Sequence, residues 1–353
     1  MTARRSALGS LVLGIALVPT LAGAQTRAAD WDVPRTADGQ PDLQGVWDFR
    51  TMTPLQRPRD QEKAVLTEEE AAELEQRAAE RVARADAPSE VRAEPLPAGQ
   101  PVGGYNNFWL DRGGRVVEDR RTALIVDLPT GRVPELQSGA IRQVGSLGED
   151  LPSQRPVRYR SGGIYPDGPE DRGVSERCIV GFNSGPPLLP GGYNQNIQLF
   201  QTPDHVVVLS EMVHEVRIVP LDGRPHVPDS VRQWLGDGRG YWDGDTLVIE
   251  SQNFSDQVAS FNAGFTTALG TGTTLHLTGR FTRVDEDTLR YEFTVDDPDT
   301  FTQPISGVLQ LQQGTQPLFE YACHEGNYGM RNSLSGARAA ELDELAENAG
   351  NPQ

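Results

Sequence analysis

Short runs of strand-forming residues, separated by tight turns, follow one another from Ile179 to Ala322, and this pattern limits what the chain can fold into. In 289–295 apolar residues alternate with polar ones, which is the two-residue period of a half-buried strand. Asp-Gly pairs at 222–223 and 243–244 are typical of the turns between such strands. The expected strands are 197–200, 206–209, 213–219, 247–250, 275–284, 289–295, 308–311 and 319–322. Roughly eight antiparallel strands joined by short turns predict a mainly β fold, either a lipocalin-like barrel or a sandwich.

The clearest helix signal lies outside this β-rich region, at 67–85. Thr67 and Glu70 have the spacing of a capping box, and good helix formers follow them. Apolar residues are sparse there, so we expect one peripheral helix, followed by a linker at 86–103 that is rich in Pro, Ala, Glu and Gly. The predicted organisation is a signal peptide at 1–24, an N-terminal segment at 25–103, a β-rich core domain at 104–334 and a C-terminal helix or tail at 335–353.

The first residues have the pattern of a secretory signal peptide. Arg4 and Arg5 precede a short apolar run at 8–18, and small residues at 22–24 predict cleavage after Ala24. The apolar run is too short to span a bilayer, and no later segment approaches the ~18 apolar residues that a span needs. The sequence therefore predicts a periplasmic or secreted protein without membrane insertion.

The net charge limits which classes of partner the protein can bind, and the cysteine content bears on the compartment in which it folds. The formal net charge is −18, which argues against nucleic acid as a partner because phosphate binding needs a basic patch. Cys178 and Cys323 are the two cysteines of the chain. In an exported protein an even cysteine count predicts a disulfide. The alternatives are two free thiols or a nucleophilic Cys323 next to His324. The oligomeric state stays open.

A first group of candidate catalytic residues lies on the expected strand 213–219 and just before it. Alternation places Glu211, Glu215 and Arg217 on one face, which is either a solvated row of ion pairs or the polar wall of a pocket. His214 lies between Met212 and Val216, so we expect it to face inward as a core residue or as a proton carrier.

A second group directly follows Cys323. His324 and Tyr328 are further catalytic candidates, and Glu325 is a candidate ligand-binding residue. A disulfide holds the Cα atoms of its cysteines within about 7 Å. Pairing of Cys178 with Cys323 would therefore bring 179–196 next to 324–330 at one common mouth.

The sequence GGYN occurs twice, at 103–106 and at 191–194. Glycine pairs permit turns that lead into strands. The functional alternative is that the side chains after each pair bind a ligand, since pockets contain a few placed polar groups. The candidate ligand-binding residues are Tyr105, Asn106, Tyr193 and Asn194.

Longer motifs occur along most of the chain after the signal peptide. They are PDLQGVW at 41–47, SERC at 175–178, EMVHEVRIVPLDGRPH at 211–226, YWDGDTLVIESQNF at 241–254, FTRVDEDTLRYEFTVDDP at 281–298 and EYACHEGNYGM at 320–330. In these motifs the chain resembles a family of exported, largely uncharacterised bacterial proteins. The resemblance implies export, and it transfers no catalytic residue.

These observations support an exported small-molecule enzyme with non-redox acid–base chemistry, such as a lyase, isomerase or hydratase. The alternatives are a non-catalytic ligand-binding barrel and a structural envelope protein. No cofactor is expected: the chain has no P-loop, and a zinc site built from His214, His226 and His324 lacks any ligand-spacing motif. Convergence of at least two catalytic candidates in one pocket would favour the enzyme, and scattered positions would favour binding or structure.

Overall fold

The computed structural model describes residues 31–87, 109–144, 168–264 and 267–350. The predicted signal peptide, all but the first two residues of the predicted linker 86–103, and the candidates Tyr105 and Asn106 lie outside the described residues.

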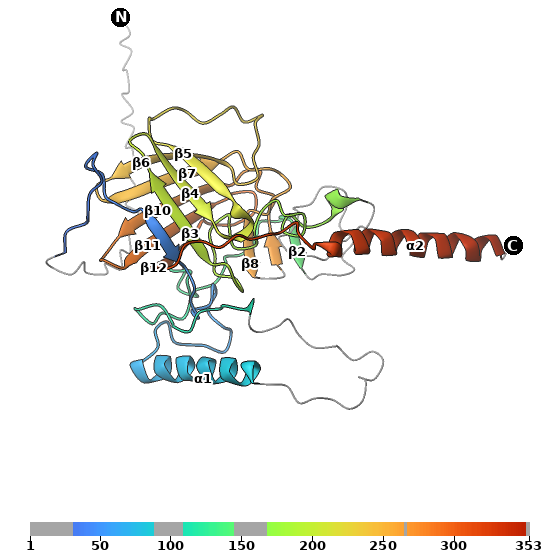
Figure 1. Ribbon diagram of the computed structural model, residues 1–353, viewed down its shortest axis with the longest axis horizontal. Helices are drawn as coiled ribbons and strands as arrows, with labels where there is room; N and C mark the ends of the chain where they lie inside the picture. The colour runs from blue at the N-terminus through green and yellow to red at the C-terminus, as the bar shows by residue number, and fades with distance from the viewer. Residues whose placement is uncertain (1–30, 88–108, 145–167, 265–266, 351–353) are drawn as a thin grey trace, which may run out of the picture.

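Nine antiparallel strands form one sheet that curls into a nearly closed barrel (Figure 1). Their order is β5-β4-β3-β1-β12-β11-β10-β7-β6, so β1 from the N-terminal segment is inserted between β3 and β12. This sheet confirms the predicted mainly β barrel. The strand bounds are β1 Gly45–Asp48, β3 Asn196–Gln201, β4 His205–Ser210, β5 Val216–Pro220, β6 Asp237–Asp243, β7 Thr246–Gln252, β10 His276–Arg283, β11 Thr288–Asp296 and β12 Ile305–Gln313.

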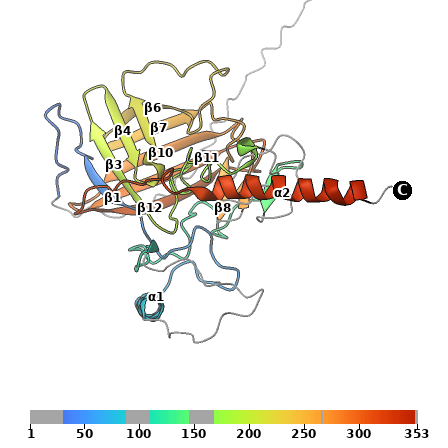
Figure 2. The ribbon, with the colours of Figure 1, turned by 45° about the vertical axis from the view of Figure 1, so that its right-hand side comes forward.

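The barrel closes through side chains at the seam between its two edge strands, β5 and β6. Gly238 and Gly240 of β6 leave room for the side chains of Val219 and Leu221. A Cβ atom on Gly240 would lie 2.7 Å from Leu221 Cδ2, so only glycine fits there without a shift. The connection from β5 to β6 runs as a long arc beyond the ends of these strands (Figures 1 and 2).

Alternation along the strands fills the barrel with apolar side chains. Trp47 of β1, Phe293 of β11 and Ile305 of β12 are fully buried there. A smaller sheet, ordered β2-β9-β8, consists of β2 Arg142–Val144, β9 Thr267–Leu269 and β8 Phe261–Gly264. Phe261 of β8 and Leu269 of β9 belong to the same apolar core as the barrel interior.

In the described residues two α-helices lie outside the barrel (Figure 1). Helix α1, Glu68–Asp86, begins with the predicted capping box, in which Thr67 and Glu70 satisfy each other's backbone N–H groups. Helix α2, Tyr328–Gly350, begins seven residues before the predicted C-terminal helix and projects away from the barrel in both views (Figure 2). No helix in the described part of the chain is long and apolar enough to cross a bilayer.

Two of the expected strands were wrong. The segment 213–219 is broken, because Met212–His214 forms a short 3-10 helix and Val213 and His214 have φ values of 59° and 44°. β5 therefore begins at Val216. The expected strand 319–322 makes no sheet ladder, and Phe319 is exposed. The disulfide at Cys323, rather than strand pairing, ties this segment to the rest of the fold.

Candidate functional site

A cavity of about 380 Å³ lies inside the barrel next to the β5–β6 seam. Strands β4, β5, β6, β7, β10 and β11 line it, together with residues 232–236 of the long connection. Its volume is near the lower end of the ~300–1,000 Å³ range of small-molecule pockets. The buried apolar residues of its wall are Val208, Val219, Leu235, Ile249, Leu277 and Phe281, and the exposed Val216 and Ile218 line it as well.

Two charged residues, Arg217 in β5 and Glu215 directly before it, face into this cavity. Val216 and Ile218 are 47% and 64% exposed, whereas Val219 is buried. The two-residue period of a strand then places Glu215, Arg217 and Val219 on the inner face. Glu215 and Arg217 both line the cavity. The charged face of this strand is therefore a pocket wall and not a solvated row of ion pairs.

Arg217 presents unused hydrogen-bond donors inside the barrel. Its Nε and Nη2 atoms are buried and have no hydrogen-bond partner. Burial lowers the pKa of Arg217, while Tyr291 and Glu215 act to raise it. A buried donor without a partner costs about 1–3 kcal/mol, and more when the group is charged. A carboxylate can accept two parallel hydrogen bonds from a guanidinium, so an acidic ligand would satisfy Arg217.

Tyr291 of β11 brings a phenol to the same cavity. Its side chain is 2% exposed, and burial raises its pKa to about 12, against the opposing effects of Arg217 and the Leu188 backbone. The phenol therefore stays neutral near neutral pH and can both donate and accept a hydrogen bond. Gly279 of β10 lies beside the ring, and a Cβ atom there would be 3.2 Å from Tyr291 Cε2.

Glu215 is the acidic group of the cavity wall. Burial raises its pKa, and the nearby charges of Arg217 and His214 partly oppose that effect. In the described part of the chain its carboxylate makes no hydrogen bond or ion pair with another side chain. Glu215 can therefore accept a hydrogen bond from a bound molecule.

Asp237, at the start of β6, also contributes to the cavity wall, but its carboxylate is already satisfied. It accepts hydrogen bonds from the Val227 backbone N–H at 3.0 Å and from Arg239 Nη1 at 2.6 Å, and His226 Nδ1 lies 3.0 Å away. Burial acts to raise the pKa of Asp237, but these three contacts outweigh it and lower the pKa. Asp237 therefore holds the long connection against β6 and leaves ligand contact to Glu215 and Arg217.

Of the first predicted group, Arg217 alone lines this cavity. Glu211 is 5% exposed, and it accepts a hydrogen bond from Asn196 Nδ2 at 2.7 Å. It also accepts one from the Phe319 backbone N–H at 3.5 Å. His214 is exposed, so its expected inward position was wrong. The 3-10 helix before β5 turns its side chain away from the barrel.

The second predicted group lies at the surface. Cys178 and Cys323 are paired as predicted, with Cα atoms 5.8 Å apart. His324, Glu325 and Tyr328 are nevertheless exposed, and they line neither of the two cavities described here. Within the described residues, no group of three or more His, Cys, Asp or Glu side chains is placed to hold a metal ion.

The predicted mouth around the disulfide forms in part. Tyr193 stacks on Tyr321 at a ring distance of 6.5 Å, so segments 179–196 and 319–328 do meet. Asn194 has a φ of 49°, and Asn183 Nδ2 donates to the backbone oxygens of Tyr193 and Asn194. These contacts make the second GGYN sequence a packed turn.

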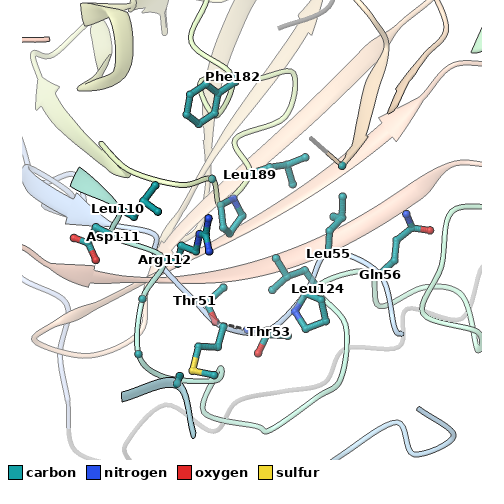
Figure 3. A pocket seen from close by; sticks show the side chains of 18 of the residues that line it. Thr51, Thr53, Leu55, Gln56, Leu110, Asp111, Arg112, Leu124, Phe182 and Leu189 are labelled. Atoms are coloured by element: carbon teal, nitrogen blue, oxygen red, sulfur yellow. Dashed lines mark hydrogen bonds between the residues drawn. The ribbon is translucent and has the colours of Figure 1, made fainter. Parts of the chain in front are cut away.

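A second cavity, of about 920 Å³, lies between α1, the loops at 51–56, 110–114 and 189–191, and β8 of the smaller sheet (Figure 3). Gln56 and Thr53 on its wall are hydrogen-bonded within the protein: Gln56 accepts from the Val133 backbone N–H and donates to the Ala263 oxygen, and Thr53 accepts from the Val117 backbone N–H. Ala85 and Leu110 line it, and most of the chain between these two residues lies outside the described residues. Asn262 Oδ1 on this wall is also buried without a hydrogen-bond partner, but it is a single amide oxygen. The barrel cavity presents two unpartnered donors of one guanidinium, Arg217, and is therefore the candidate site.

Sequence reasoning missed Tyr291 and the inward position of Glu215. The alternation of 289–295 marks Tyr291 as a buried residue. A buried tyrosine brings a hydroxyl into an apolar interior, and this was the signal in the sequence that could have identified it as a site residue. No family model, curated protein or solved structure matches this chain, so the resemblance to exported bacterial proteins stays a prediction.

Proposed function

We propose that this protein binds a small organic acid inside its barrel and holds the acid group on Arg217. The observation that carries the proposal is the pair of buried Arg217 donors, Nε and Nη2, which have no partner. Buried donors that lack a partner destabilise a fold, so the position of these two in a cavity wall is explained by a ligand that accepts hydrogen bonds from them. The apolar side chains around it suit a hydrophobic ligand body.

Binding without turnover agrees better with the geometry than acid–base catalysis does. The predicted enzyme relied on His214 or His324 to move a proton, and both side chains are exposed. Arg217 is the one predicted catalytic residue in the cavity wall. The acid–base enzyme stays a prediction, in which Glu215 would have to replace the histidines as proton carrier.

The proposed setting is the periplasm or the exterior of the cell. The signal-peptide pattern before Gln25 supports it. The paired Cys178 and Cys323 are compatible with an oxidising compartment. A ligand-binding barrel in that setting would capture an acid or carry it.

The proposal is tested by isothermal titration calorimetry, which measures the affinity for small carboxylic acids that contain one ring and for the primary amides of the same acids. We expect the carboxylates to bind and the uncharged amides to bind much more weakly. Arg217→Met should reduce carboxylate affinity by about 10–100-fold, because hydrogen bonds to charged groups contribute about 1.5–3 kcal/mol.

The matched control is Arg280→Met on the outer face of β10, where Arg280 pairs with Asp243. It should bind carboxylates like the unmodified protein. Equal affinity for acids and amides, or full acid binding by a folded Arg217→Met protein, would contradict the proposal.

A further inference from the structure

Glu215 and Arg217 form a pair of opposite charges on one wall of the barrel cavity. They are two residues apart at the start of β5, so their Cα atoms are separated by about 6.6 Å along the strand. Both side chains face the interior. An acidic and a basic group are thus presented to the same small volume.

Glu215 and Arg217 do not satisfy each other's hydrogen-bonding groups. Each influences the pKa of the other, yet the described structure contains no ion pair between them, and Arg217 Nε and Nη2 stay unpartnered. A ligand with an acid group alone would satisfy Arg217 and leave the Glu215 carboxylate facing the filled cavity without a donor. Burying an unpaired carboxylate is costly.

We infer that the ligand carries a hydroxyl or amino group within a few bonds of its acid group, so that the acid binds Arg217 while the donor binds Glu215. The inference rests on the proposed function and defines the ligand class: a small hydroxy or amino acid with an apolar body. The hydroxyl or amino group of the ligand also explains why the acidic Glu215 lines a site that binds an acidic ligand.

The rest of the wall defines the body of this ligand. Leu277 and Phe281 of β10 and Ile249 of β7 are buried apolar residues of the cavity wall. Gly238 and Gly279 also line the cavity and add no side chain to it. A volume of about 380 Å³ suits a body of one ring or one short branched chain.

Two probes that differ in one hydroxyl test the inference by calorimetry. They are 3-phenyllactate, which has an acid and a neighbouring hydroxyl, and 3-phenylpropionate, which lacks the hydroxyl. A site built to hydrogen-bond a ligand hydroxyl discriminates strongly against an analogue without it. We expect 3-phenyllactate to bind the unmodified protein at least about 10-fold more tightly.

Three variants connect this preference to Glu215. In Glu215→Met the two probes should bind with equal affinity, whereas Glu215→Gln keeps an acceptor oxygen and should keep part of the preference. Glu250→Met, at an exposed position of β7, should keep all of it. Circular dichroism establishes that each variant is folded.

The outcomes separate the inference from the proposed function. Equal binding of both probes to the unmodified protein, with binding still dependent on Arg217, overturns the inference and leaves the proposed function standing. A preference that survives in Glu215→Met also overturns the inference. Failure of both probes and of the simple carboxylates to bind overturns both.

Discussion

Arg217 and Tyr291 meet at one cavity although four strands separate β5 from β11 in the sheet. The meeting results from barrel curvature, which brings distant strands of one sheet to a shared interior. Burial raises the pKa of Tyr291 to about 12 in spite of the guanidinium nearby. The cavity therefore pairs a permanent cation with a neutral phenol, which is a setting suited to an anionic ligand.

Replacing Arg217 with methionine should stabilise the unliganded protein. The change removes buried donors that have no partner, and we expect a gain in unfolding free energy of about 1–3 kcal/mol, the cost of one unsatisfied buried group. Urea denaturation followed by fluorescence measures it.

The contrasting variant is Arg172→Met, because Arg172 is buried and pairs with Glu176 through two hydrogen bonds. Breaking that pair should cost about 3–5 kcal/mol. A large loss of stability in Arg217→Met would show that Arg217 has a structural partner.

Glu215→Gln should change how stability depends on pH. The pKa of Glu215 is raised in the folded protein, so the folded state binds its proton more tightly than the unfolded chain does. The contribution of Glu215 to stability is complete below its unfolded pKa and is lost as pH rises through the folded pKa. The variant should therefore have the higher urea midpoint at about pH 7 and lose this advantage near pH 4. Parallel pH profiles for both proteins would contradict the expectation, and Glu250→Gln is the exposed control.

Filling the cavity from β6 should abolish binding and preserve the fold. Gly238 lines the cavity, and a Cβ atom there would be 3.4 Å from Val219 Cγ2, an ordinary contact. Gly238→Leu should therefore fold and lose carboxylate binding, whereas Gly238→Ala should keep most of it. Calorimetry and a thermal melt of each variant measure the two effects. Normal binding by a folded Gly238→Leu protein would place the ligand elsewhere.

Loss of the disulfide should destabilise the protein substantially. Cys178 and Cys323 are 145 residues apart in sequence, and the chain-entropy model gives about 4–5 kcal/mol for a loop of this length. We expect Cys178→Ser to unfold at a clearly lower urea concentration. Peptide mapping without reductant should show the Cys178–Cys323 pair in the unmodified protein. Two freely alkylated thiols in the native state would exclude the bond.

Local sequence patterns were sufficient to predict much of the fold. The alternation in 289–295 predicted β11, and the spacing of Thr67 and Glu70 predicted the start of α1. These features depend on residues that are close in sequence, where periodicity and capping chemistry act directly. Strand β6 was missed because its glycines, Gly238 and Gly240, carry no side chains that could show a period.

The position of the site could not be predicted in the same way. Alternation did assign Glu215 and Arg217 to one face, but it does not say whether that face points inward. The break at His214 and the place of β5 at the seam made their face the inner one. His214, which was expected inside, lies outside for the same reason.

The sequence by itself determined most of the long strands, the turns between them and the cysteine pairing, because each of these follows from short-range pattern or from cysteine count. Only the tertiary structure decided that Arg217 and Tyr291 share a cavity with Glu215. That convergence depends on how far the sheet curls before its edge strands meet. The curvature of the sheet accumulates over all nine strands, so the pattern of no single strand encodes it.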